Sequence, residues 1–267
     1  MAAQGLRFTT GTSPGLIKSV PARAGEDEAG EEAVTAPDHP GRPEHLEVVD
    51  PRHAKSTKSR IAMLHALANI EAWAIDVSWD IIARFAAKHP ELPDAFFDDW
   101  VAVADDEARH HSQLVARLEE LGSHFGALPV HEGLWETAET TADSLLARLA
   151  VMHMVHEAHG LDVTPKTIAR FASQGDKTSA EMLQHIYEEE ITHVAAGLRW
   201  FTWLCDRDGL DTLPLFYDLV RANFAGSLKP PFNTDGRAAA GMTEEWYLPL
   251  VEPKKPKKAA AATEAAA

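Results

Sequence analysis

The chain has 267 residues, a hydrophobic fraction of 45% and a formal net charge of −16, which suits one helical domain with a core of roughly 200 residues. The negative charge argues against a broad nucleic-acid surface, and no apolar run reaches the length of a membrane span. A single cysteine, Cys205, excludes an intrachain disulfide and any zinc or iron–sulfur site built on cysteines. Because the N-terminus also lacks the apolar segment of a signal peptide, the expected compartment is a reducing cytoplasm.

Four regions follow one another along the chain. Residues 1–57 lack hydrophobic periodicity and are expected to form a largely irregular N-terminal extension. A helical bundle is expected over 58–225, and a C-terminal segment that wraps it over 226–253. The Pro, Lys and Ala composition of 254–267 predicts a solvated, disordered tail to which we assign no role.

Periodic apolar stripes predict four long helices within the bundle. They are expected at about 59–88, 93–121, 141–160 and 176–206. The segment between the second and third helices is long enough to cross to the far end of the bundle, as in ferritin-like topology. Pro165 is expected to open a short extra helix, and a further helix at about 213–224 should pack outside. The predicted fold is therefore all-α: a ferritin-like four-helix bundle with a long crossover between two helix hairpins, an extra C-terminal helix and an N-terminal extension.

Two copies of one metal-ligand spacing stand out in the bundle. They are Glu107-x-x-His110 and Glu190-x-x-His193. Residues three apart lie on one face of a helix, so such a Glu and His can bind one metal ion together. A single copy is more often a surface ion pair, and the motif alone therefore decides little.

A glutamate on the preceding predicted helix accompanies each motif. Glu71 and Glu157 lie at the separation expected of matching depths on adjacent antiparallel helices, each within an apolar stripe. A carboxylate on such a stripe is costly unless it is paired, protonated or bound to a cation. One Glu from each of two helices plus a Glu-x-x-His from each of two others is the ligand set of di-metal carboxylate bundles. The predicted ligands are Glu71, Glu107, His110, Glu157, Glu190 and His193.

Other polar side chains near the motifs have weaker claims. His153 lies four residues before Glu157 and could serve as an outer hydrogen-bond partner or a seventh ligand. His111 and His156 point away from the ligand face, and we expect them at the surface or behind the ligands. Tyr187, one turn before the second motif, is the only candidate for a catalytic side chain, although a core role is the simpler interpretation.

Two acidic runs flank the motifs. They contain Asp105, Asp106, Glu188 and Glu189, and most of each run is expected to face water. Their charge is therefore assigned to the solvated surface.

The donor set favours iron, with manganese as the alternative, over copper or a structural zinc. Two Fe(II) ions could together reduce O₂ and so oxidise an unidentified substrate. No glycine-rich phosphate loop is present, so the electron donor is expected to be a separate protein. Glu71 and His110 are expected on one metal, Glu157 and His193 on the other, and Glu107 and Glu190 as bridges.

Several runs resemble a known family: GRPEHLEVVDPR, HALANIEAWAIDVSWDIIARF, DDWVAVADDEARHHSQLVARLEELG, LPVHEGLWETAETTADSLLARLA, EAHGLDVTP and EEEITHVAAGLRWFTWLC. Over roughly 40–250 the chain resembles the ferritin-like family called domain of unknown function 455. The resemblance implies a ferritin-like bundle with a di-metal site, whose six ligand positions all match here, but no settled activity. A tRNA-modifying di-iron hydroxylase of the wider superfamily is similar in size and helix pattern, and this makes tRNA the one nucleic acid worth testing.

Three classes of function remain open from the sequence. The first is a di-iron oxidoreductase of the hydroxylase or oxidase type. The second is an iron-handling protein, acting in ferroxidation, storage or delivery without an organic substrate. The third is a metal-free helical interaction module, although an empty site would leave four carboxylates repelling one another. The substrate, the metal used in the cell and the oligomeric state are not indicated.

Overall fold

The computed structural model describes residues 39–50 and 59–251, and within these ranges every regular element is a helix. The prediction of an all-α fold is confirmed for this part of the chain. The predicted tail at 254–267 and residues 1–38 of the predicted extension lie outside it. None of the helices in the described ranges is long and apolar enough to cross a membrane.

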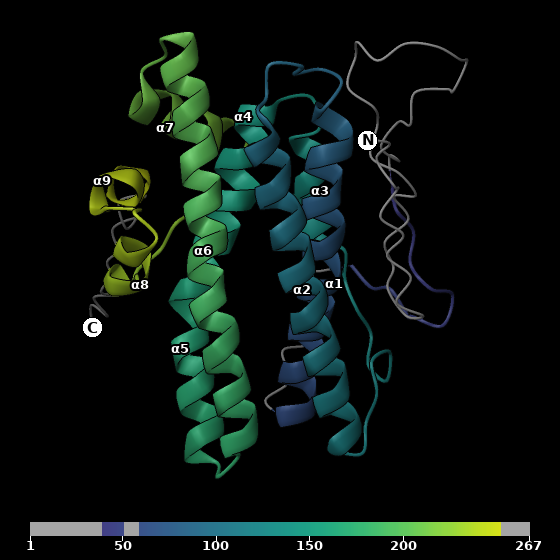
Figure 1. The fold of residues 1–267 in the computed structure, drawn as a ribbon. Helices are drawn as coiled ribbons and strands as arrows, with labels where there is room; N and C mark the ends of the chain where they lie inside the picture. The colour runs from purple at the N-terminus through teal and green to yellow at the C-terminus, as the bar shows by residue number, and fades with distance from the viewer. Residues whose placement is uncertain (1–38, 51–58, 252–267) are drawn as a thin grey trace, which may run out of the picture.

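The first two helices form one antiparallel pair (Figure 1). Helix α1 spans Arg60–Phe85 and α2 spans Asp94–Glu120, close to the predicted bounds. The Ser59 hydroxyl caps α1 by accepting a hydrogen bond from the Ala62 amide at 3.1 Å. Beyond α2, Gly122 has a φ of 77°, a left-handed conformation that suits glycine and ends the helix.

A long connection then returns along α1 to the other end of the molecule (Figure 1). It ends in the short helix α3, Gly133–Thr140. The connection is anchored at His131, whose carbonyl accepts hydrogen bonds from Asn69 at 2.9 Å and Trp73 at 3.1 Å. The connection is thus long, and it is held against α1.

Residues 39–50 form a strap beside the same connection. The Val49 amide donates to the Val130 carbonyl at 2.8 Å. The Arg42 guanidinium lies 3.3 Å from the centre of the Trp73 ring and donates to Asp76 at 2.9 Å. The strap thus places a buried ion pair against α1.

The second pair consists of one long composite helix and α6. The composite helix comprises α4 (Leu145–Arg148), a π-helical segment η2 (Leu149–His156) and α5 (Glu157–Ser173). Helix α6 spans Lys177–Asp208. Its N-cap is Asp176, whose side chain accepts a hydrogen bond from the Ser179 backbone amide. In Figure 1, α2 and α5 run in the same direction, while α1 and α6 run opposite to them.

The composite helix continues through Pro165, so the prediction that this proline opens a separate helix is wrong. Proline lacks the N–H that would bond the carbonyl four residues earlier. That carbonyl, on Leu161, instead accepts a hydrogen bond from the Asn233 side chain at 3.0 Å. A residue far along the chain therefore replaces the missing bond.

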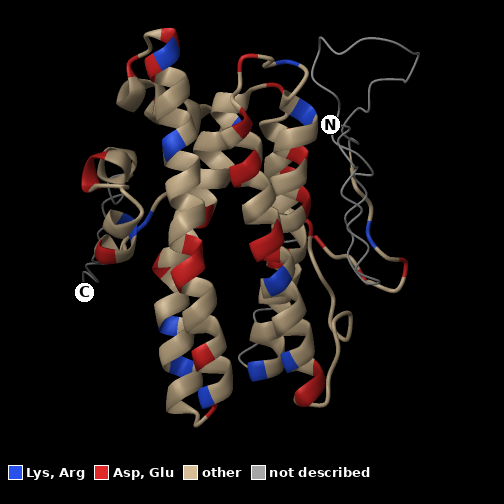
Figure 2. Ribbon diagram, viewed as in Figure 1, with Lys and Arg blue, Asp and Glu red and all other residues tan. Residues whose placement is uncertain are grey.

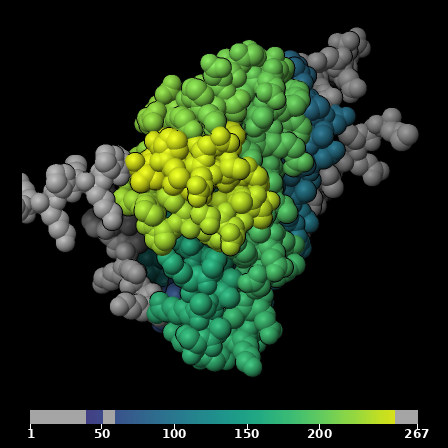
Figure 3. All heavy atoms as spheres, turned by 90° about the vertical axis from the view of Figure 1, so that its left-hand side faces the viewer, coloured from purple at the N-terminus to yellow at the C-terminus, as the bar shows by residue number. Residues whose placement is uncertain are grey.

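The C-terminal part packs on the outer face of the second pair. It contains α7 (Thr212–Asn223), α8 (Thr234–Ala239), α9 (Glu244–Tyr247) and a final 3₁₀ turn, Leu248–Leu250. Figure 3 shows the last part of this segment, coloured yellow, lying on the green and teal surface of the helices before it.

A buried ion pair fixes this segment, and we call it the C-terminal clamp. Arg237, on α8, donates to both carboxylate oxygens of Asp162, on α5, at 3.0 and 2.6 Å. Its guanidinium also lies over the rings of Phe232 and Tyr247. The backbone N–H of Asn233 donates a further hydrogen bond to Asp162 at 2.8 Å.

Two apolar clusters lie on either side of the middle of the helices, and a third, smaller one includes Trp73 of α1 and Trp135 of α3. Of the first two, one contains residues from the start of α1, the end of α2 and the α5–α6 turn, among them Leu64 and Leu118. The other contains residues from the opposite ends of these helices, among them Phe96 and Phe201. Among the tryptophans, Trp73 and Trp200 are buried, while Trp79 and Trp203 are partly buried.

Candidate metal centre

The middle of the helices, between the two apolar clusters, carries acidic residues on both pairs (Figure 2). All six predicted ligands meet there, in two sets whose potential ligand atoms each lie within 4.8 Å of one another. The sets share Glu107 and Glu190. The first set is Glu71, Glu107, His110 and Glu190; the second is Glu107, Glu157, Glu190 and His193.

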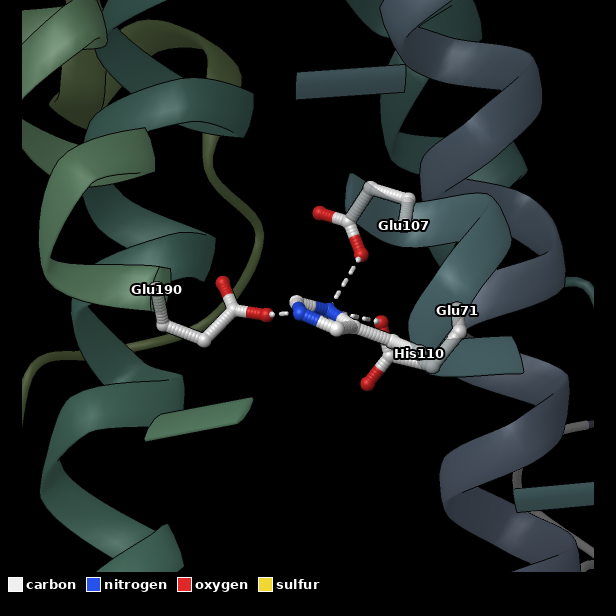
Figure 4. Close-up of side chains that lie close together, drawn as sticks. All are labelled: Glu71, Glu107, His110 and Glu190. Atoms are coloured by element: carbon white, nitrogen blue, oxygen red, sulfur yellow. Dashed lines mark ion pairs between the residues drawn. The ribbon is translucent and has the colours of Figure 1, made fainter. Parts of the chain in front are cut away.

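His110 lies at the centre of the first set (Figure 4). Its Nδ1 is 3.5 Å from Glu71 Oε2, 3.5 Å from Glu107 Oε2 and 3.3 Å from Glu190 Oε1. Three carboxylates from three helices thus face one imidazole nitrogen.

His193 has the equivalent position in the second set. Its Nδ1 is 3.2 Å from Glu107 Oε1 and 3.1 Å from Glu190 Oε2. Both imidazoles therefore direct the same ring nitrogen, Nδ1, toward the two shared glutamates.

A metal cation fits this arrangement of donors. Glu107 Oε2 and His110 Nδ1 are buried and have no hydrogen-bond partner, although they lie 3.5 Å apart. Buried polar atoms without partners are rare and call for a missing water or ion. The surrounding atoms are carboxylate oxygens and imidazole nitrogens, which iron and manganese accept.

The carboxyl groups show the electrostatic cost of the cluster without a cation. Burial, followed by repulsion from Glu107, raises the pKa of Glu71 well above its usual value. Burial, followed by the charges of Glu190 and Glu107, does the same to the pKa of Glu157. For Glu107 burial acts upward, but the neighbouring Glu71, His110 and His193 together hold its pKa well below the usual value. Burial and mutual repulsion therefore disfavour the charged forms of Glu71 and Glu157, which a bound cation would favour.

Burial acts on the imidazoles in the opposite direction. Burial alone would lower the pKa of His110 and of His193. The carboxylates around them, Glu107 and Glu190 among them, outweigh burial and raise both pKa values well above the usual range. Metal binding would displace protons from these nitrogens.

Two outer carboxylates hold the other ring nitrogens in a crossed arrangement. Glu189, on α6, contacts Nε2 of His110, on α2, at 2.8 Å. Asp106, on α2, contacts Nε2 of His193, on α6, at 3.2 Å. Arg109 donates to Glu189 at 3.1 and 3.2 Å and also to Asp106, joining the two. Such outer carboxylates fix the orientation of ligating imidazoles and increase their basicity.

The expectation that the acidic runs mostly face water therefore misses the role of these two residues. The sequence does carry a signal, because each outer carboxylate immediately precedes the glutamate of its motif. The crossing to the opposite helix depends on the register of α2 and α6, which the sequence does not contain.

Comparison with known proteins places the chain in a family. The model of the family described as "Protein of unknown function (DUF455)" matches residues 14–248. The chain belongs to this family. This DUF455 chain is similar to an "Uncharacterized protein" of Haemophilus influenzae, with 37% identity over 186 residues. That match covers 68% of this chain and 65%, slightly less than two thirds, of the relative. No solved structure matches.

The π-helical segment brings the composite helix of this DUF455 chain close to α6. A Cβ atom at Gly197 would lie 2.3 Å from the carbonyl oxygen of His153, so only glycine permits this approach. The segment ends at His156, directly before Glu157. Short π-helical segments are frequent at functional sites, and here one positions a member of the cluster.

Three further histidines considered from the sequence, His111, His153 and His156, are buried or partly buried. His111 is buried, and its Nδ1 contacts the Ala68 carbonyl at 2.8 Å, so the expectation of a surface or ligand-supporting position is wrong for it. His156 is partly buried, and its ring contacts Phe224. His153 is fully buried beside Trp100, and burial followed by the Arg148 charge lowers its pKa, which keeps it neutral. It belongs to neither ligand set, and its role as an outer partner stays a prediction.

Tyr187 lies on the outer side of α6, in contact with the C-terminal segment. Its hydroxyl accepts a hydrogen bond from the Asn233 side chain at 2.8 Å. It belongs to neither set of ligand atoms. A catalytic role for it stays a prediction.

Proposed function

We propose that this protein is a ferritin-like di-iron carboxylate oxidoreductase that uses O₂ to oxidise an organic substrate, as a hydroxylase or oxidase. The observation that carries the proposal is the pair of ligand sets sharing Glu107 and Glu190. In the proposed bundle the four helices are α1, α2, the composite helix and α6. The long crossover between two helices of the same direction supports a ferritin-like topology (Figure 1).

Iron is the proposed metal, and manganese is the alternative, because carboxylates dominate the donors. Bound Fe(II) would supply the electrons for the reduction of O₂. The residues that would hold the two ions are Glu71 and His110 for one, Glu157 and His193 for the other, and Glu107 and Glu190 between them.

The protein's own side chains prepare the centre for that chemistry. Glu189 and Asp106 hold the Nε2 atoms of the two imidazoles, so that Nδ1 faces inward. Burial raises the pKa values of Glu71 and Glu157, and a bound cation would lower them by favouring the charged carboxylates. The apolar clusters on either side limit access of water to the centre.

The proposed partners are dioxygen, an organic substrate still to be identified and a separate electron-donor protein. The expected compartment is the cytoplasm. Small metabolites and tRNA are the substrates to screen first.

The first experiment measures metal content by plasma mass spectrometry on protein purified without a chelating tag. Wild type should hold about two iron or manganese ions per chain, the stoichiometry of such bundles. Glu107→Ala and His193→Ala should lose them. Glu188→Ala is the matched control, because Glu188 is exposed, belongs to neither ligand set and should leave the metal content unchanged. Absence of metal even after anaerobic Fe(II) loading would favour a helical interaction protein.

A second experiment separates oxidation of a substrate from iron handling. Fe(II)-loaded protein is mixed with O₂, and bound metabolites or added tRNA are then searched for oxidised products. A storage protein would instead elute as a large shell and load iron far beyond the two ions of a di-metal centre.

A further inference from the structure

A chain of five rings leads from the metal centre toward the surface. We call it the aromatic chain. Neighbouring ring centres are 4.1, 6.0, 5.3 and 5.8 Å apart. Its members, from inside to outside, are His153, Trp100, Phe96, Trp200 and Trp203.

The inner end adjoins the candidate ligands. His153 precedes Glu157 by one helical turn, and Trp100 precedes Glu107 by about two turns, or about 10 Å along the axis of α2. The outer end, Trp203, is partly exposed, and the Arg207 guanidinium lies 5.3 Å from its ring centre. The rings therefore connect the centre with solvent.

The two inner tryptophans differ in what their indole N–H groups meet. The Trp200 N–H donates to Asp99 at 2.7 Å, and the Asp99 side chain is 28% exposed and contacts Arg199. The Trp100 N–H is buried and has no partner. Tryptophan is one of the most easily oxidised side chains, and losing its N–H proton stabilises the oxidised form. Only Trp200 of these two has a carboxylate beside it to accept that proton.

Core packing alone would account for ring contacts, since aromatic side chains dominate protein cores. It does not require the outermost buried indole to be bonded to a partly exposed carboxylate. Trp246 gives a comparison within the same protein, because its ring contacts are with Phe201 and Phe216, away from the ligand sets.

We propose that the aromatic chain carries a one-electron oxidation from the metal centre outward to Trp200 when no substrate is bound. The inference rests on the proposed function. Trp200 gives one electron through Phe96, Trp100 and His153 to the oxidised centre, which is reduced by one electron. The indole proton passes to Asp99, and a neutral radical remains on Trp200. An external one-electron reductant, such as ascorbate or a thiol, returns the electron, and Asp99 returns the proton. The ligands are thereby spared oxidation.

The test uses the full-length protein, loaded anaerobically with Fe(II) and then mixed with O₂ without substrate. Iron oxidation is followed by absorbance, radicals by freeze-quench electron paramagnetic resonance, and oxygen adducts by peptide mass spectrometry. Wild type should give a tryptophan radical and adducts at Trp200 and Trp203. Trp200→Phe should lose the radical and move the adducts to Trp100 and the ligands, while Trp246→Phe should behave as wild type.

Asp99→Asn supplies a second variant, which is expected to fold because the side chain is partly exposed and keeps an acceptor oxygen. It should shorten the lifetime of the radical, because the amide does not take the proton. An unchanged radical and adduct pattern in Trp200→Phe overturns the aromatic chain. Iron oxidation without any tryptophan oxidation overturns it too, but leaves the proposed function standing. Failure to bind or oxidise iron overturns both.

Discussion

The C-terminal clamp and the candidate metal centre are both buried and charged, but only in the clamp does each charge meet an opposite one. In the clamp, Asp162 meets Arg237 through two hydrogen bonds, so that acid and base balance. In the centre, four glutamates surround two imidazoles, and atoms of Glu107 and His110 have no hydrogen-bond partner.

The difference shows which kind of buried charge points to a ligand. A balanced pair fastens one segment of the chain to another, and it needs nothing from outside. An excess of carboxylates is tolerated only with added protons or a cation. The imbalance, more than burial itself, therefore marks the functional site.

Removing the base of the clamp should have the largest effect. Arg237→Ala leaves Asp162 buried and unpaired, which should lower the free energy of unfolding by about 3–5 kcal/mol, as measured by urea denaturation. Asp162→Asn combined with Arg237→Met removes both charges and should recover part of the loss. If Arg237→Ala lowered the free energy of unfolding by only about 0–1 kcal/mol, as for a surface ion pair, the clamp would not be important for stability.

A bound cation should balance the carboxylates of the centre, as Arg237 balances Asp162 in the clamp, and so stabilise the protein. At a free Fe(II) or Mn(II) concentration about 100 times the dissociation constant, the free energy of unfolding should rise by about 2.7 kcal/mol. His193→Ala should abolish this rise, and Glu188→Ala should preserve it. Thermal unfolding under anaerobic conditions measures the effect, and equal stabilisation of all three proteins would contradict a specific centre.

The pair Arg42–Asp76 is an intermediate case, because a base is present but burial dominates. Burial raises the pKa of Asp76 to about 7, while Arg42 acts in the opposite direction. The unfolded carboxyl titrates near 3.9. Between about pH 5 and pH 7 the folded protein holds a proton that the unfolded chain has lost, so stability should fall by about 2 kcal/mol as the pH rises. Urea titrations at several pH values should show this fall in the free energy of unfolding in wild type but not in Asp76→Asn. The same dependence on pH in both proteins would assign the fall to other groups.

Two glycines test how far the centre depends on close helix packing. Gly197→Ala should destabilise the protein by about 1–3 kcal/mol and weaken metal binding, because its Cβ would strike the His153 carbonyl. Gly160→Ala, with no atom within 4 Å of the added Cβ, should stabilise α5 by about 0.5–1 kcal/mol. Denaturation and metal titration of both variants give the comparison. Equal effects of the two changes would mean that the approach of η2 to α6 is not constrained.

Much of the centre could be predicted because its ligands obey local rules. Helical periodicity places Glu107 and His110 on one face, and the apolar stripe around Glu71 marks that face as buried. These relations need only the spacing of residues within single helices. The all-α fold of the described ranges followed from the same patterns, whereas the membership of the family was indicated by the resemblance of whole runs of sequence.

Features that depend on distant residues could not be predicted. The continuation of α5 through Pro165 requires Asn233 at the Leu161 carbonyl, about seventy residues away. The support of His110 by Glu189 requires the relative register of α2 and α6. Both follow from tertiary packing, which overrides the local signals for a break and for a solvated acid.

The crossed contacts of Glu189 with His110 and of Asp106 with His193 also constrain how the molecule can move. Each of the two helices both gives and receives one carboxylate, and Arg109 binds the two carboxylates together. A slide of α6 along α2 by one turn, about 5.4 Å, would break both contacts in a single step. The His110 half and the His193 half of the centre are therefore coupled mechanically. We expect them to open together, by separation of α2 from α6, rather than one after the other.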